Sequence, residues 1–108
     1  MTILERHVHD VRNVQAYWKR ARQFQEIEDR LGGFPPKRYY GLIAGRDNSG
    51  TMAQEREWEN LSVMEAAYEK LFNEPGINDL AESGPAIGNT ERTEYYFVET
   101  PPTAEPGV

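Results

Sequence analysis

The chain contains no cysteine among its 108 residues, and its only histidines are His7 and His9. The absence of cysteine excludes disulfide bonds, thiolate metal sites and catalysis by a cysteine nucleophile. It also suits a reducing compartment, so we expect a cytoplasmic protein. Because both histidines lie near the N-terminus, any imidazole chemistry is confined to one short segment.

Long apolar runs and an excess of positive charge are also missing. No segment approaches the ~18 consecutive apolar residues of a membrane-spanning helix, and the first residues lack the apolar run of a signal peptide. Lysine and arginine number 12 against 18 aspartates and glutamates, which gives a formal net charge of −6. Neutralisation of phosphates by lysine and arginine dominates nucleic-acid binding, so this charge disfavours it. We expect a soluble protein that binds neither membranes nor nucleic acid.

The hydrophobic pattern predicts the order strand, helix, strand, strand, helix, strand. Strands are expected at residues 2–9, 37–44, 51–59 and 91–98, and helices at residues 13–31 and from Ser62 to the residue before Pro75. Asn13 is the expected N-cap of the first helix, and Ser62-x-x-Glu65 matches a capping box for the second. Turn-forming residues at 45–50 predict a hairpin, and a short helical turn is expected at 77–80. Residues 100–108, rich in proline, are expected to form an extended or disordered tail on a domain of residues 1–99.

This order predicts the ferredoxin-like βαββαβ sandwich, an α+β fold with both helices on one face of an antiparallel sheet. In a monomer, the opposite face of the sheet would be exposed to solvent. Residues 37–44 nevertheless carry apolar or aromatic groups at both parities of the strand. The simplest cover is the sheet of a second copy, so we expect a homodimer that packs through sheet faces.

The most distinctive local pattern runs from Glu55 to Pro75. It contains Trp58-Glu59-Asn60-Leu61 at a strand end, then Glu65-Ala66-Ala67-Tyr68-Glu69-Lys70-Leu71 and Asn73-Glu74-Pro75. This segment resembles the second half of NIPSNAP-type domains, and the resemblance extends over most of residues 2–99. It implies a dimeric α/β barrel, in a superfamily that includes antibiotic-biosynthesis-type monooxygenases, haem-degrading enzymes and small-molecule isomerases. Haem-degrading relatives place a histidine ligand on the second helix, where this chain has none.

The two histidines lie two residues apart on a predicted strand, so their imidazoles point to the same face. Glu5 shares this parity, and the three side chains would supply a two-histidine, one-carboxylate metal set. Three consecutive same-face residues span ~13 Å in a regular strand, which is too far for all three to reach one ion easily. We therefore expect no metal site, and histidines that are hydrogen-bonded or at the surface.

Aromatic side chains are expected between the sheet and the helices, where they either pack as core or line a pocket for a flat organic ligand. The expected pocket residues are Tyr17, Trp18, Trp58, Tyr68 and Phe72. If a pocket exists, the candidates for polarising a substrate or moving a proton are His7, Tyr39, Arg56 and Tyr95. The glycines show no nucleotide-binding order, and no cofactor is expected.

Three classes of function remain open. The resemblance favours a NIPSNAP-like, cofactor-independent small-molecule enzyme of the oxygenase or isomerase type. The alternatives are a noncatalytic small-molecule-binding domain and a structural dimerisation module. A cavity with convergent polar groups would favour the enzyme, whereas a densely packed interior would favour the structural module.

Overall fold

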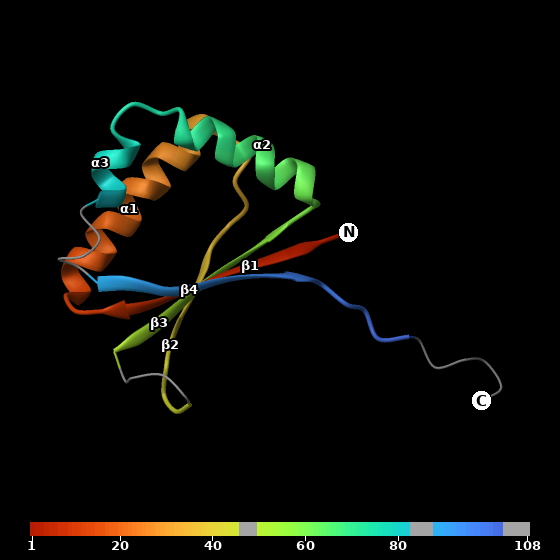
Figure 1. Ribbon diagram of the computed structural model, residues 1–108, viewed down its shortest axis with the longest axis horizontal. Helices are drawn as coiled ribbons and strands as arrows, with labels where there is room; N and C mark the ends of the chain where they lie inside the picture. The colour runs from red at the N-terminus through yellow and green to blue at the C-terminus, as the bar shows by residue number, and fades with distance from the viewer. Residues whose placement is uncertain (46–49, 83–87, 103–108) are drawn as a thin grey trace.

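The computed structural model describes residues 1–45, 50–82 and 88–102, in which four strands form one antiparallel sheet (Figure 1). The elements are β1 (Ile3–Val11), α1 (Val14–Leu31), β2 (Arg38–Gly41), β3 (Thr51–Trp58), α2 (Leu61–Phe72), α3 (Ile77–Glu82) and β4 (Gly88–Phe97). The strand order is β2-β3-β1-β4, and the helices lie on one side of the sheet. The predicted ferredoxin-like α+β sandwich is therefore confirmed.

Helix α1 begins and ends where the sequence predicts. Asn13 is the N-cap, and its side chain accepts a hydrogen bond from the backbone N–H of Ala16 at 3.0 Å. At the other end the N–H of Gly32 donates to the carbonyl of Glu28 at 2.8 Å. Gly32 has a φ of 77°, in the left-handed region where a residue without a Cβ is favoured.

Helix α2 begins earlier than expected, and the predicted capping box is wrong. The N-cap is Asn60, whose side chain accepts from the N–H of Val63 at 2.9 Å. Ser62 lies inside the first turn and is exposed. Asparagine caps a helix as well as serine does, and Asn60 comes first after β3, so it takes the position.

The strands differ from prediction at their ends. β1 extends to Val11 because its ladder with β4 continues to Gly88, and β4 accordingly starts before the expected residue 91. β2 stops at Gly41, and Ile43 is fully exposed at 100%. Residues 46–49 of the turn expected at 45–50, and residues 103–108 of the tail, lie outside the described residues. In the part that is described, no helix is both long enough and apolar enough to cross a membrane.

The two faces of the sheet are chemically different. On the helix side, Ile3, Trp58, Met64 and Ala67 form the hydrophobic core, and Trp58 is only 1% exposed. On the opposite face, strand parity places charged residues that pair across strands, such as Arg6 with Glu55 at 2.6 Å. The helix side of the sheet is therefore where a buried site can form.

Candidate functional site

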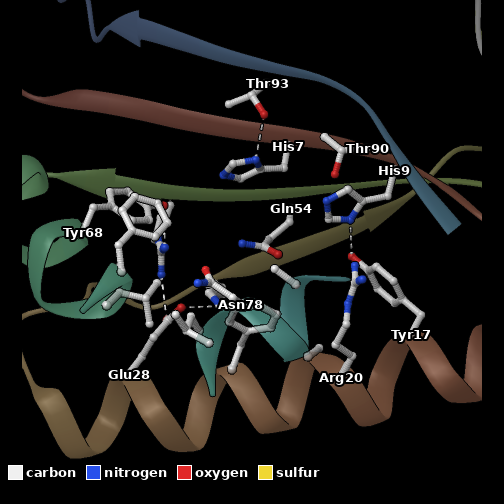
Figure 2. A pocket seen from close by; sticks show the side chains of 18 residues that line it. His7, His9, Tyr17, Arg20, Glu28, Gln54, Tyr68, Asn78, Thr90 and Thr93 are labelled. Carbon is white, nitrogen blue, oxygen red and sulfur yellow. Dashed lines mark hydrogen bonds and ion pairs between the residues drawn. The ribbon is translucent and has the colours of Figure 1, made fainter. Parts of the chain in front are cut away.

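A cavity of about 550 Å³ lies between the helix side of the sheet and α1, α2 and α3 (Figure 2). This volume falls within the range of roughly 300–1,000 Å³ that is usual for small-molecule sites. The sheet contributes His7, His9, Gln54, Arg56, Thr90 and Thr93 to its lining. His7 and His9, like Gln54 and Arg56, are two residues apart on their strands, and a register shift in the ladder of β1 with β4 pairs Thr90 with His9 and Thr93 with His7, so all six face the helices.

Helix α1 forms the opposite wall of the cavity. Tyr17, Arg20, Phe24 and Glu28 all line the cavity, and their spacing of three or four residues places them on one face of the helix. α2 adds Tyr68 and Phe72 at one end. The face of α1 that lines the cavity therefore carries both apolar and ionisable side chains.

Arg56 organises one end of the cavity. Its Nε donates to Oε1 of Glu5 at 2.8 Å, its Nη1 to Oε1 of Glu28 at 2.8 Å, and its Nη2 to Oη of Tyr68 at 2.7 Å. The second oxygen of Glu28 lies 2.9 Å from Nζ of Lys37. Two carboxylates thus face two cations in this cluster, and Arg56 itself is only 3% exposed.

The charges of this cluster are stabilised by one another. Burial alone would raise the pKa of Glu5, but hydrogen bonds from His7, Tyr68 and Arg56, with the positive charge of Arg56, lower it to about 2. Burial lowers the pKa of Lys37, and the neighbouring Glu28 opposes that shift. Burial also raises the pKa of Tyr68, so the phenol keeps its proton. Because its pKa is about 2, Glu5 is ionised at neutral pH.

His9 lies toward the other end of the cavity, beside Tyr17 and Arg20 (Figure 2). Its Nδ1 is 2.9 Å from Oη of Tyr17. Burial, helped by His7, Arg20 and Lys37, lowers the pKa of His9 to about 4. The imidazole is therefore neutral at pH 7, whereas burial raises the pKa of Tyr17 and keeps its phenol protonated.

The two histidines differ in how many of their ring nitrogens have a partner. Nδ1 of His7 lies 3.0 Å from Oγ1 of Thr93, and its Nε2 lies 3.3 Å from Oε2 of Glu5. The rings of His7 and His9 are stacked with their centroids 6.2 Å apart. Among the described residues, no partner contacts Nε2 of His9. His9 is thus the imidazole with a nitrogen left for a ligand.

The structure separates the residues that the sequence grouped as one site. Of the predicted candidates, His7, Arg56, Tyr17, Tyr68 and Phe72 line the cavity. Trp18 and Tyr39 do not; their rings pack edge to face, with centroids 4.9 Å apart. Trp58 lies in the core instead of the pocket, and its Nε1 donates to Glu5 at 3.2 Å.

Tyr95 belongs to a second, smaller cavity of about 400 Å³. This cavity lies between α2 and the sheet and shares His7, Tyr68 and Phe72 with the larger one. Tyr95 is 55% exposed, so it lies near the solvent. Of the four candidates for polarising a substrate or moving a proton, Tyr95 therefore lines a different cavity from Arg56.

Sequence reasoning missed the charged cluster and the pairing of His9 with Tyr17. Glu28 had a visible signal, because it continues the stripe of Tyr17 and Phe24 along α1. Lys37 follows two prolines and carries no such signal. In the described chain no three metal-ligating side chains are grouped to hold an ion, since Glu5 is bonded to Arg56, Trp58 and Tyr68.

The architecture of this chain is similar to that of proteins of known structure. No protein-family model matches the sequence, and no curated protein does either. A NIPSNAP family protein from Agrobacterium tumefaciens has a similar structure, with a TM-score of 0.69 at 16% identity over 94% of this chain and 95% of that chain. The chain has a NIPSNAP-like fold. The structural likeness confirms at the level of fold what the segment from Glu55 to Pro75 implied.

Two further structures share this NIPSNAP-like fold. An uncharacterised NIPSNAP-like domain protein from Burkholderia xenovorans matches with a TM-score of 0.65 at 12% identity, over 97% of this chain and 90% of that one. SnoaB, a cofactor-independent oxygenase from Streptomyces nogalater, matches with a TM-score of 0.65 at 12% identity, over 95% and 98%. Because identities this low establish a common fold alone, the chemistry has to be argued from the cavity itself.

Proposed function

We propose that this NIPSNAP-like protein is a cofactor-independent enzyme, of the oxygenase or isomerase type, that takes a proton from a small organic substrate in the larger cavity. The position and the environment of His9 support this proposal most directly. His9 is a neutral imidazole on the wall of a ligand-sized cavity, with one nitrogen held by Tyr17. In the tautomer whose Nδ1–H donates to Oη of Tyr17, Nε2 carries the lone pair and can accept a proton from a molecule bound beside it.

The environment of His9 suits a substrate that becomes an anion. Burial is the main cause of the lowered pKa of His9, and the positive charges of Arg20 and Lys37 lower it further. Negative charge that develops on the substrate offsets those cations, so the imidazole becomes a stronger base as the proton moves. The substrate proton must itself be fairly acidic, as in a C–H group flanked by carbonyl or aromatic groups.

Both reaction types share this first step. In an isomerisation, the proton returns to a different atom of the substrate. In a cofactor-independent oxygenation, the electron-rich anion itself reduces dioxygen, so that no metal or flavin takes part. SnoaB, a cofactor-independent oxygenase with the same fold, supports the second outcome.

The other candidates take supporting roles in this proposal. Arg56 has three of its nitrogens bonded to protein groups, so it holds the shape of the cavity and does not reach a substrate freely. His7 is held by Thr93 and Glu5 and forms the wall next to His9. Phe72 contributes an apolar ring against which a flat substrate can pack.

The test compares the wild-type protein with His9→Gln, which removes the titratable nitrogen and keeps a polar side chain. A panel of 1,3-diketones and aryl ketones is incubated in D₂O, with hydrogen exchange followed by NMR and dioxygen uptake followed with an electrode. We expect the wild type to accelerate exchange of at least one compound, and the variant to be slower by ~10²–10⁴-fold. Equal rates would contradict a role for His9, and binding without any exchange would favour the noncatalytic alternative.

We also propose that the protein is a homodimer packed through the sheet face opposite the helices. Tyr40 and Tyr96 are 47% and 42% exposed, and strand parity places both on this face. The charges around them are paired within the chain, as in Arg6 with Glu55. An identical face can therefore cover the two tyrosines without separating Arg6 from its carboxylate partner. Sedimentation at micromolar concentration tests this, and a stably folded monomer would contradict it.

A further inference from the structure

In the part of the chain that the structure describes, one charged side chain of the larger cavity has no counter-charge. The charged side chains in the lining are Arg20, Glu28, Lys37 and Arg56. Glu28 binds both Lys37 and Arg56, and Arg56 also binds Glu5. Among the described residues, no side chain forms an ion pair or hydrogen bond with the guanidinium of Arg20. The described wall of the cavity therefore carries one unbalanced positive charge.

Arg20 is placed where a bound molecule would meet it. It lies three residues after Tyr17 on the cavity face of α1, and its side chain extends toward His9 and Tyr17 (Figure 2). It is partly buried, so water solvates its guanidinium less completely than that of a surface arginine. Arg20 also acts on His9 electrostatically, because its positive charge is among the causes that lower the pKa of His9.

We infer that the cavity binds a small organic acid whose carboxylate is held by Arg20 and whose apolar body packs toward Phe24 and α2. A guanidinium donates two parallel hydrogen bonds to a carboxylate, which fixes the orientation of the ligand as well as its charge. This inference deepens the proposed function, and it rests on the larger cavity being the ligand site. It makes Arg20 the residue that selects the class of substrate.

A carboxylate fits the described wall better than a phosphate does. One guanidinium balances one negative charge, whereas a phosphate monoester carries about −1.5 to −2 at pH 7. The other cations of the lining, Lys37 and Arg56, are already bound to Glu28. Asn78 and Thr90 are among the neutral polar groups of the lining that a carboxylate can also use.

Binding of the acid would also change the base. His9 is faced by His7 from its own strand, by Tyr17 and Arg20 from α1, and by Lys37 from the segment before β2. A carboxylate bound to Arg20 offsets the positive charge of this residue, so proton uptake by His9 becomes easier. A substrate with this group thus prepares the imidazole to accept its proton.

The experiment uses phenylacetate as the probe, its uncharged analogue phenylacetamide, and phenyl phosphate, with affinities measured by NMR titration of the full chain. We expect phenylacetate to bind the wild type at least about tenfold more tightly than the amide, which corresponds to about 1.4 kcal/mol. Arg20→Gln should abolish this preference while amide binding is retained. Arg22→Gln, on the same helix but exposed, should keep it.

Several results would count against the inference. Equal affinity for acid and amide in the wild type, or a preference that survives in Arg20→Gln, would overturn it. Tighter binding of phenyl phosphate than of phenylacetate would overturn the carboxylate assignment, and failure of every probe to bind would remove the ligand site itself. Because binding requires no turnover, the same titration on His9→Gln separates the two proposals: an inactive protein that still prefers the acid leaves the role of Arg20 intact.

Discussion

The two ends of the larger cavity differ in how completely their charges are paired. At the Arg56 end, two carboxylates and two cations bind one another, and Tyr68 adds a phenol that contacts both Arg56 and Glu5. At the His9 end, a neutral imidazole has one partner, and Arg20 has none among the described residues. Buried charges that satisfy each other stabilise a shape, whereas unsatisfied groups in a cavity are available to bind a ligand.

The largest expected effect of a substitution is at the paired end. Arg56→Met keeps the unbranched apolar part of the side chain but removes the guanidinium, which leaves Glu5 without its cation and Glu28 with Lys37 alone. Removing one partner of a buried ion pair strands an uncompensated charge, so we expect the free energy of unfolding to fall by ~3–5 kcal/mol. Urea denaturation at pH 7 measures this. A variant as stable as the wild type would show that the cluster does not stabilise the fold.

A matched pair of substitutions compares the ends directly. Tyr68→Phe removes a hydroxyl that contacts two charged groups, so we expect a loss of ~1–3 kcal/mol. Tyr17→Phe removes a hydroxyl with a single neutral partner, His9, and should cost only ~0.5–1.5 kcal/mol. Both are measured by the same denaturation. A larger loss for Tyr17→Phe would reverse the assignment of structural and functional ends.

The smallest effect at neutral pH is expected for His9→Gln, which should alter stability mainly in acid. The pKa of His9 falls from its ordinary 6.5 to about 4 in the folded protein, so the unfolded chain takes up this proton first. Stability should therefore decline as the pH falls from about 6.5 to 4, and the variant should lack that part of the decline.

Glu5 provides an internal control for that measurement. Its pKa is lowered from 4.5 to about 2, so its contribution is present above pH 4.5 and is lost as the pH falls toward 2. Both proteins should show this second decline. Melting temperatures at intervals from pH 7 to 3 test the prediction, and parallel curves for wild type and variant between pH 6.5 and 4.5 would refute it.

The fold was predictable because its determinants are local. The apolar stripe of α1, its cap at Asn13 and its ending at Gly32 all lie within one stretch of chain, and the strands alternate over a few residues. The errors have a physical pattern. Asn60 and Ser62 are both good caps two residues apart, and β2 ends where its pairing with β3 ends, which β2 alone does not encode.

The site was only partly predictable because its contacts join distant residues. Sequence alone determined that aromatic and charged side chains would face the interior of a sandwich, since residue type and period set that orientation. Only the tertiary structure decided which charges would meet: Arg56 pairs with Glu5 across 51 residues and with Glu28 across 28. A buried charge must be neutralised by whatever the fold brings beside it, and no local period specifies that partner. For the same reason, the lack of a partner for Arg20 among the described residues emerges only once the partners of its neighbours are known.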